Sequence, residues 1–382
     1  MEENMKKLTM VLLALFVASS LFAGGGSQKP AGGGGALIGL AMPETHVLRW
    51  IKDGNQLKAE AEKRGYQAEV QWANADQPTQ NQQIQSFLTQ GAKVLVVGCL
   101  NDGVGSVIAE AKRDGVAVIA YDRIIQNSED YDYYITFNNF KVGVLQAESI
   151  VAGLELDKAT AATAKYITLF AGSPTDGNAF FFFDGAMSVL TPYIDKGVLK
   201  VVGPHPKTSA DTAAFQQIAT EGWNASIAKT RMENLLNNAA RNVTLDAILA
   251  PNDTLARAIL EACKADAKYR TKLPVISGQD AEFDSAMSIK NGEQYSTVFK
   301  DTAKLAEAAI ILADAIIKGQ ATPTIPGAVL AADVSAELKE IGNTGKKYVH
   351  AYLLDPILVT KSNLNVPVNA GFYTADEAAQ LK

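Results

Sequence analysis

Charged and amide side chains recur in this chain immediately after short apolar runs. Asp122 and Arg123 follow one such run, Gln279 and Asp280 follow another, and Lys300 follows a third. Carboxylates and amide oxygens accept hydrogen bonds, whereas Arg, Lys and amide NH₂ groups donate them. Each hydroxyl of a sugar both donates and accepts, so this mixture suits a polyhydroxylated neutral ligand. A charged ligand would instead require an excess of one sign, and these segments hold both signs.

The polar segments of this kind are distributed over both halves of the chain. They are 43–44 continuing to Arg49 and Trp50, then 101–102, 122–123, 138–139, 173–178, 252–253, 279–280 and Lys300. Aromatic residues that could pack against the apolar C–H faces of a pyranose are Trp50, Trp223 and 180–183. We therefore expect a sugar site built from several distant segments.

Each of these segments lies at the end of an expected β-strand or at the start of an expected helix. From residue 36 onward, short β-rich apolar runs alternate with longer helical stretches, which is typical of a parallel sheet covered by helices. We predict strands over 37–42, 68–72, 94–99, 116–121, 134–137, 166–171, 199–202, 247–250, 275–277 and 295–299, and helices over 45–63, 80–89, 104–114, 141–154, 177–191, 227–237 and 254–265. Five strands in each half predict two doubly wound α/β domains. Ligands bind beyond the carboxyl ends of parallel strands, so two polar edges should face each other across a cleft.

The amino-acid composition excludes several classes of function. The chain has 382 residues, 47% of them hydrophobic and 20% charged, which predicts a globular protein of about two domains. Its 35 basic and 41 acidic residues give a net charge of −6, so the basic surplus that drives nucleic-acid binding is missing and we expect no nucleic-acid partner. Two cysteines and three histidines are scattered singly. We therefore expect no disulfide framework, no metal site and no cofactor.

The N-terminus has the layout of a secretory signal peptide. Lys6 and Lys7 precede an apolar run over 8–23, which ends at Ala23 before a string of glycines. The run is shorter than the about 20 residues that span a bilayer. We predict cleavage after Ala23, a Gly/Ser-rich linker over 24–35, and a soluble periplasmic product. The helical run over 305–317 is too short to span a membrane and indicates a buried helix.

Six strings, in order along the chain, carry a resemblance to a known family. They are Ala41-Met42-Pro43 with Arg49-Trp50; Ile119-Ala120-Tyr121-Asp122-Arg123; Thr136-Phe137-Asn138-Asn139 followed by Val142-Gly143-Val144-Leu145-Gln146-Ala147; Gly172-Ser173-Pro174 with Asp176 and Asn178-Ala179-Phe180-Phe181-Phe182; Ser277-Gly278-Gln279-Asp280-Ala281-Glu282; and Gly292-Glu293-Gln294-Tyr295-Ser296-Thr297 leading to Lys300. Together they resemble the periplasmic sugar-binding proteins of bacterial ABC importers, in the xylose-binding and multiple-monosaccharide-binding branch.

The resemblance implies a fold and a function. The fold would be a type I periplasmic binding protein, α/β, with two Rossmann-like doubly wound lobes joined by a three-strand hinge. The N-terminal lobe would comprise 36–139 plus 301–325, and the C-terminal lobe 140–300 plus 326–382. Such a protein encloses a monosaccharide, here xylose, glucose or a similar aldopyranose, and delivers it to the membrane permease of an ABC importer. We expect a monomer that is not an enzyme.

The resemblance also implies a set of sugar-binding residues, to which Trp50 and Asn139 are added from their positions after predicted strands. The full set is Arg49, Trp50, Asp122, Arg123, Asn139, Asp176, Asn178, Trp223, Asn252, Asp280 and Lys300. Two departures affect it. Gly177 stands where relatives often have a second Asn, and the stretch 205–222 matches poorly, which affects the placement of Trp223.

Two other functions remain open at this stage. Asp122, Asp176 and Asp280 around a sugar could serve as the acid and nucleophile of a glycosidase. Neighbouring Arg, Lys and Asn side chains would instead hold these carboxylates ionised, which favours binding over catalysis. Alternatively, the protein could act as a sugar receptor for chemotaxis or signalling.

Overall fold

The computed structural model describes residues 35–47 and 49–382. The predicted signal peptide over 1–23 and all but the end of the linker over 24–35 lie outside the described residues. Within the described part, no helix has both the length and the hydropathy needed to cross a bilayer. The same residues contain no group of three or more His, Cys, Asp or Glu side chains placed to hold a metal ion.

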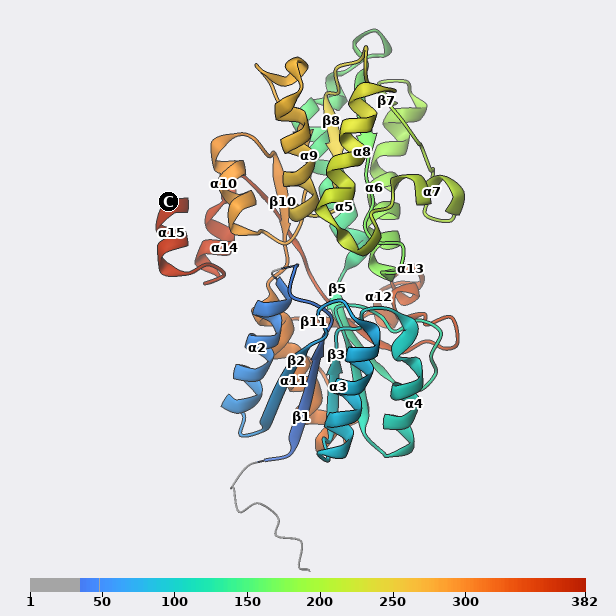
Figure 1. Ribbon diagram of the computed structural model, residues 1–382, viewed down its shortest axis with the longest axis vertical. Helices are drawn as coiled ribbons and strands as arrows, with labels where there is room; N and C mark the ends of the chain where they lie inside the picture. Colours follow the sequence, from blue (N-terminus) through green and yellow to red (C-terminus); the bar gives the residue numbers. More distant parts are fainter. Residues whose placement is uncertain (1–34, 48) are drawn as a thin grey trace, which may run out of the picture. The chain divides into compact units, whose positions relative to one another are not determined.

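The first lobe is built on a sheet that has seven strands within the described chain (Figure 1). In spatial order they are β11 (Ala328–Leu330), β12 (His350–Leu354), β5 (Tyr133–Phe137), β4 (Ala117–Tyr121), β3 (Val94–Val97), β1 (Leu37–Met42) and β2 (Gln67–Trp72). All neighbours are parallel except β11 and β12, which are antiparallel. The carboxyl ends of the parallel strands therefore lie on one edge of the sheet.

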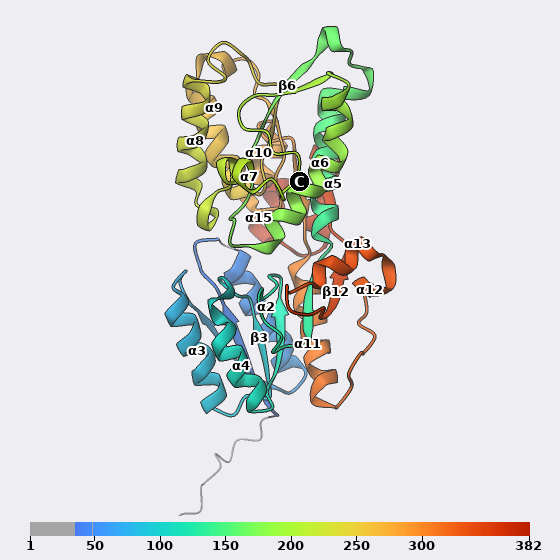
Figure 2. The same ribbon diagram turned by 90° about the vertical axis from the view of Figure 1, so that its right-hand side faces the viewer.

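Helices cover both faces of this sheet (Figure 2). Side chains alternate along each strand, so Leu40 packs with α2 (Arg49–Lys63) and α11 (Thr302–Ile317), whereas Ala41 packs with α3 (Gln77–Thr89) and α4 (Gly105–Arg113). Burial on both faces explains why β1, β3 and β4 are continuous apolar runs, whereas the edge strand β2 alternates between polar and apolar residues. The helix predicted over 45–63 begins only at Arg49, so Arg49 and Trp50 occupy its first turn.

The second lobe has a parallel sheet of four described strands, in the order β7 (Leu199–Val201), β6 (Lys165–Leu169), β8 (Ala247–Leu249) and β9 (Val275–Ile276). Helices α5 (Asn139–Leu154) and α6 (Gly177–Asp195) pack as one pair, and α8 (Ala225–Asn237) and α9 (Asp253–Ala265) as another. A short helix, α7 (Thr212–Ile218), precedes α8. The two α/β lobes of the predicted fold class are thus confirmed.

One expected strand of the second lobe pairs differently. β10 (Ser296–Phe299) does not extend the parallel sheet, but pairs antiparallel with β13 (Ile357–Thr360). Helices α10 (Phe283–Asn291), α14 (Asn365–Asn369) and α15 (Ala375–Leu381) lie beside this ribbon (Figure 1). Their core is formed by Phe299, Phe372 and Tyr373 with neighbouring aliphatic side chains.

The lobe boundary near the C-terminus was predicted wrongly. The chain passes between the lobes after β5, after β10 and between β12 and β13, so the final crossing falls after residue 354 rather than at 326. β12 is in parallel register with β5, from His350 opposite Tyr133 to Leu354 opposite Phe137. The segment between β11 and β12, with α12 (Ala331–Val334) and α13 (Ala336–Lys339), therefore also belongs to the first lobe. The free edge of β5 pairs with β12, a strand much later in the sequence. No local sequence pattern predicts a pairing between such distant segments.

The α5 and α6 helices touch backbone to backbone. A Cβ atom added at Gly143 would lie 1.8 Å from the carbonyl oxygen of Phe182, and one at Gly185 would lie 2.0 Å from that of Phe140. Only glycine permits this approach. The close contact holds the N-terminal ends of the two helices together at the edge of the cleft.

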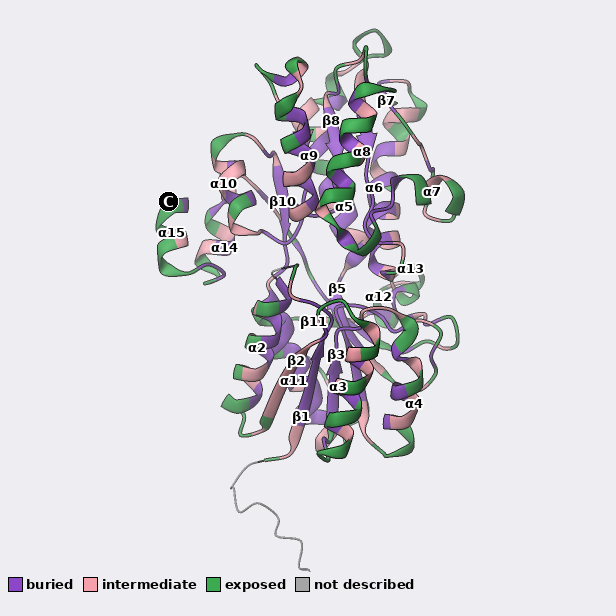
Figure 3. Ribbon diagram, viewed as in Figure 1, coloured by how far each residue is buried: buried purple, intermediate pink, exposed green. Residues whose placement is uncertain are grey.

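The described part of each lobe contains one cysteine in its interior. Cys99 follows β3 in the first lobe and Cys263 lies in α9 of the second lobe, and both are free and buried. Burial raises the pKa of each thiol to about 12. Figure 3 shows the same pattern of buried strands and exposed outer helix faces in both lobes.

Candidate functional site

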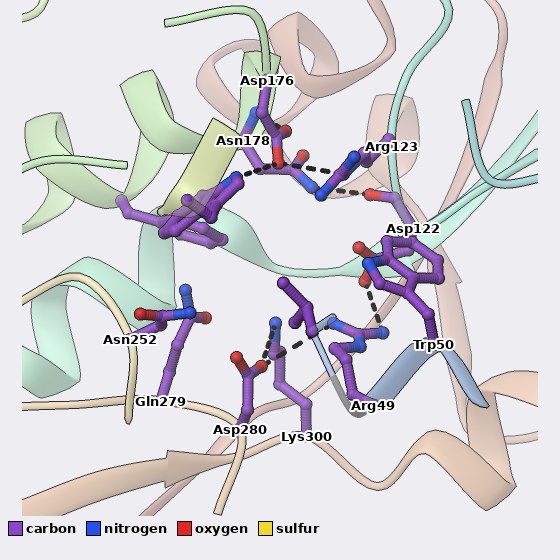
Figure 4. A pocket seen from close by; sticks show the side chains of 13 residues that line it. Arg49, Trp50, Asp122, Arg123, Asp176, Asn178, Asn252, Gln279, Asp280 and Lys300 are labelled. Carbon is purple, nitrogen blue, oxygen red and sulfur yellow. Dashed lines mark hydrogen bonds and ion pairs between the residues drawn. The ribbon is translucent and has the colours of Figure 1, made fainter. Parts of the chain in front are cut away.

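A pocket lies where the strand ends of the two lobes meet (Figure 4). Its lining is charged, polar and aromatic. The lining residues are Val47, Arg49, Trp50, Asp122 and Arg123 from the first lobe, and Asp176, Asn178, Phe182, Trp223, Asn252, Gln279, Asp280 and Lys300 from the second. The pocket therefore lies at the carboxyl ends of the parallel strands, where ligands bind in α/β proteins of this kind.

Arg49 is the centre of one ion-pair group. Its Nη2 atom lies 2.9 Å from Asp122 Oδ1 and 2.7 Å from Asp53 Oδ2, and its Nη1 atom lies 3.7 Å from Asp280 Oδ1. Asp53 is fully buried one turn further along α2, so it fixes the guanidinium from behind while Asp122 and Asp280 face the pocket. Lys300 completes the group, with Nζ at 2.9 Å from Asp280 Oδ1.

Arg123 is the centre of the other group. Its Nε atom lies 3.1 Å from Asp176 Oδ2, and its Nη2 atom lies 3.3 Å from Glu44 Oε1. The Nε1 atom of Trp223 also donates to Asp176 Oδ2, at 3.2 Å. Trp50 contacts both arginines, because the guanidinium carbons of Arg49 and Arg123 each lie 5.0 Å from its ring.

Three lining residues hold unusual backbone conformations. Asp122 has φ of 61°, Trp223 of 56° and Asp280 of 94°, in the region that costs non-glycine residues energy. The carbonyl oxygen of Asp122 accepts hydrogen bonds from Tyr134 at 2.8 Å, Thr136 at 3.0 Å and Asn178 Nδ2 at 2.7 Å. These bonds offset the strain and keep the Asp122 carboxylate directed into the pocket.

The indole of Trp223 lies against Gly172. A Cβ atom added at Gly172 would lie 2.1 Å from the Trp223 ring, so no other residue leaves room for the indole. Phe182 meets the same ring edge to face, with centroids 6.4 Å apart. The position of Trp223 is therefore fixed by packing as well as by its bond to Asp176.

Charge balance determines the ionisation of the buried groups. Burial works to raise the pKa of Asp122, but Arg49, Lys300 and Arg123 outweigh it and hold that pKa below its usual value. Burial raises the pKa of Glu44 and of Asp53, which have fewer cations near them. Burial acts to lower the pKa of Arg49, but Asp122 and Asp53 raise it well above the usual value, so the guanidinium stays charged.

Some buried polar atoms of the site have no protein partner. Among the described residues, Arg49 Nε and Gln279 Oε1 are buried and make no hydrogen bond. The first is a donor and the second an acceptor. Buried polar groups are normally paired, so these two atoms are suited to a ligand that both accepts and donates.

Ten of the predicted site residues line the pocket, and one does not. Asn139 is buried behind it and donates through Nδ2 to Asn178 Oδ1 at 2.7 Å. Three lining residues were absent from the predicted set: Val47, Phe182 and Gln279. Phe182 lies one turn after Asn178 on α6 and Gln279 directly precedes Asp280, so both had a positional signal, whereas Val47 had none.

Comparison with known proteins identifies the class to which this fold and site belong. The model of the periplasmic binding protein domain matches residues 38–321. The chain belongs to the periplasmic binding protein family.

Two relatives show the extent of the sequence similarity. The multiple sugar-binding periplasmic receptor ChvE of Rhizobium radiobacter is 42% identical over 89% of this chain and 91% of its own length. The D-xylose-binding periplasmic protein of Haemophilus influenzae is 38% identical over 89% of this chain and 91% of its own.

Among solved structures, an ABC transporter solute-binding protein from Clostridium phytofermentans with bound β-D-glucose has a TM-score of 0.78 at 34% identity, covering 90% of this chain and 99% of that one. A carbohydrate transporter solute-binding protein from Chloroflexus aurantiacus, in complex with D-glucose, has a TM-score of 0.78 at 31% identity, covering 89% and 97%. The predicted family resemblance is confirmed.

Proposed function

We propose that this protein captures an aldopyranose such as xylose or glucose between its lobes in the periplasm and delivers it to the membrane permease of an ABC importer. The observation that carries the proposal is the interlobe pocket, where three cations and three carboxylates surround amide and indole groups. Two relatives are named for the binding of multiple sugars or of D-xylose, and two similar solved structures contain glucose. These names and ligands support the same ligand class for this protein.

The pocket chemistry matches that of a sugar. Asp122, Asp176 and Asp280 accept hydrogen bonds from hydroxyl groups, and Arg49, Arg123 and Lys300 donate to hydroxyl oxygens. Trp50 and Trp223 offer aromatic faces or edges to the C–H groups of the ring. In the structure these charged side chains pair with one another, so hydroxyl groups would replace parts of those ion pairs rather than meet isolated charges.

Binding requires the lobes to move. The cavity among the lining side chains has a volume of about 30 Å³, far below the about 300–1,000 Å³ that is usual for small-molecule sites. A pyranose therefore needs the two edges to separate and close again around it. The three chain crossings between the lobes allow such a hinge motion, and the closed form is what a permease would recognise.

We propose that the site binds its sugar without cleaving it. A glycosidase needs a carboxyl group with a raised pKa as the acid. The pKa of Asp122 is instead lowered by three cations. A role as a sugar receptor for chemotaxis uses the same closed form and would add a partner to the permease.

The proposal is tested by thermal shift and calorimetry. A ligand that binds only the folded protein raises its melting temperature. We expect D-xylose or D-glucose to raise it, whereas NAD, amino acids and divalent metal ions do not. Nitrophenyl glycosides should remain intact on prolonged incubation. No shift with any common pentose or hexose, or release of nitrophenol, would refute the proposal.

A further inference from the structure

A second, larger cavity adjoins the candidate sugar site. It has a volume of about 440 Å³, within the about 300–1,000 Å³ that is usual for small-molecule sites. The two cavities share Arg49 and Asp280, which line both. The remaining lining residues are Lys52, Glu282, Phe283, Gly371, Phe372, Tyr373, Thr374 and Glu377. They come from α2, from the start of α10, from the segment between α14 and α15, and from α15 itself.

Arg49 and Asp280 line both cavities and therefore lie at their boundary. Arg49 Nη1 and Asp280 Oδ1 are 3.7 Å apart, which is longer than a hydrogen bond. A linkage between two groups can cross this boundary only where the Arg49–Asp280 pair separates, and at 3.7 Å this pair is looser than the 2.7 Å and 2.9 Å contacts of Arg49 with Asp53 and Asp122. A glycosidic oxygen accepts hydrogen bonds but has no proton to donate, and Arg49 supplies donors on that side.

The walls of the second cavity combine aromatic rings with charges. Phe283, Tyr373 and Phe372 pack in sequence, with centroid distances of 6.1 Å and 5.3 Å. The Tyr373 hydroxyl donates to the carbonyl oxygen of Ala281 at 2.7 Å, which fixes this ring beside Asp280. Lys52 reaches from α2 to this wall, donates to the carbonyl oxygen of Phe372 and lies 3.6 Å from its ring centroid.

We propose that this second cavity is a subsite for the second sugar ring of a disaccharide whose first ring occupies the interlobe pocket. Aromatic rings suit the C–H face of a pyranose, and Lys52 and Glu377 can meet its hydroxyls. The inference rests on the proposed function, because it names a wider class of ligand for the same site. With this subsite, the protein would bind disaccharides as well as monosaccharides.

The test is calorimetry with D-glucose, D-xylose, cellobiose, maltose and xylobiose on the full protein. We expect at least one disaccharide to bind one to one, with a Kd within about tenfold of that of its monosaccharide, a difference of about 1.4 kcal/mol. The Phe283→Leu variant keeps an apolar side chain in the C-terminal core but removes the flat ring. It should weaken the disaccharide about tenfold or more and change the monosaccharide by less than about twofold.

A matched control and a second variant keep the test independent of folding. Phe180 lines a different cavity, so Phe180→Leu should change neither affinity. Lys52→Met keeps the side-chain stem, removes the ammonium group and should selectively weaken the disaccharide. A protein that binds monosaccharides but no disaccharide would overturn this inference and leave the proposed function standing. Absence of binding to every sugar would overturn both.

Two further outcomes also decide the matter. Equal losses of monosaccharide and disaccharide affinity in both variants would show that the second cavity only supports the first. Binding of phenyl β-D-glucopyranoside without any disaccharide would assign the cavity to an aromatic substituent and overturn its assignment to a second sugar ring.

Discussion

Replacing Arg123 by Ala tests the site most directly, because this side chain joins the two lobes. It links Asp176 of the second lobe to Glu44 of the first, and it also lies over Trp50. All three charged groups are less than a tenth exposed, so solvent screens them little. The substitution leaves two buried carboxylates with one cation fewer.

The expected magnitude follows from these contacts. Deleting a charged partner in a dry site costs about 2 kcal/mol or more of binding free energy. That loss is about 30-fold in Kd. Breaking a buried pair also lowers the free energy of unfolding, by about 3–5 kcal/mol. Because Arg123 acts to lower the pKa of Glu44, its removal should raise that pKa further and favour the protonated acid.

Calorimetry and chemical denaturation measure the two effects separately. Arg123→Lys should give an intermediate loss, since an ammonium group cannot reproduce the planar donor pattern of a guanidinium. The control is Lys229→Ala, an exposed position on α8, which should change affinity by less than about 0.5 kcal/mol. A Kd for Arg123→Ala within about twofold of the wild type, measured on folded protein, would refute the reasoning.

Three other substitutions test separate parts of the structure. Gly172→Ala should displace the Trp223 indole, weaken sugar binding and cost about 1–3 kcal/mol of stability, as overpacking does, and calorimetry with denaturation will show both effects. Asp280→Ala removes the carboxylate between Arg49 and Lys300 and should weaken sugar binding by about 2 kcal/mol or more; an unchanged Kd would place the ligand elsewhere. Burial raises the pKa of Asp253 well above its usual value, so this group contributes stability at low pH that is lost as pH rises through the folded-state pKa. Asp253→Asn removes that dependence, and the unfolding free energy should fall less between pH 4 and pH 8 than in the wild type; an unchanged pH profile would contradict the assignment.

Much of the site could be predicted because strand ends have a clear sequence signal. Asp122 and Asp280 each follow an apolar run, and the topology of a parallel sheet brings such positions to one edge. Trp223, which follows the stretch 205–222 where the resemblance is weak, lines the pocket, and its indole donates to Asp176. The local sequence pattern and the rule for parallel sheets were together sufficient to predict that these residues lie at the pocket.

Other features depend on contacts that no local pattern reveals. Asn139 lies two residues after the end of β5, yet it points at Asn178 rather than into the pocket, because the close α5–α6 packing brings the two helix ends together. The assignment of β12 to the first lobe depends on which sheet edge is free. The ion pair between Asp53 and Arg49 had an i, i+4 signal, but nothing in the sequence indicated that both side chains are buried.

The single cysteine in each lobe makes the local stability of the two halves measurable without any added label. The Sγ atom of Cys99 lies against the carbonyl oxygens of Arg123 and Ile124, so a thiol reagent reaches it only when the loop after β4 opens. Cys263 reports in the same way on α9. Because the modification rate of a buried thiol follows the population of the open form, two rates would report two opening equilibria in one experiment. A bound sugar that grips both lobes should slow both reactions, whereas one held by a single lobe should slow only one.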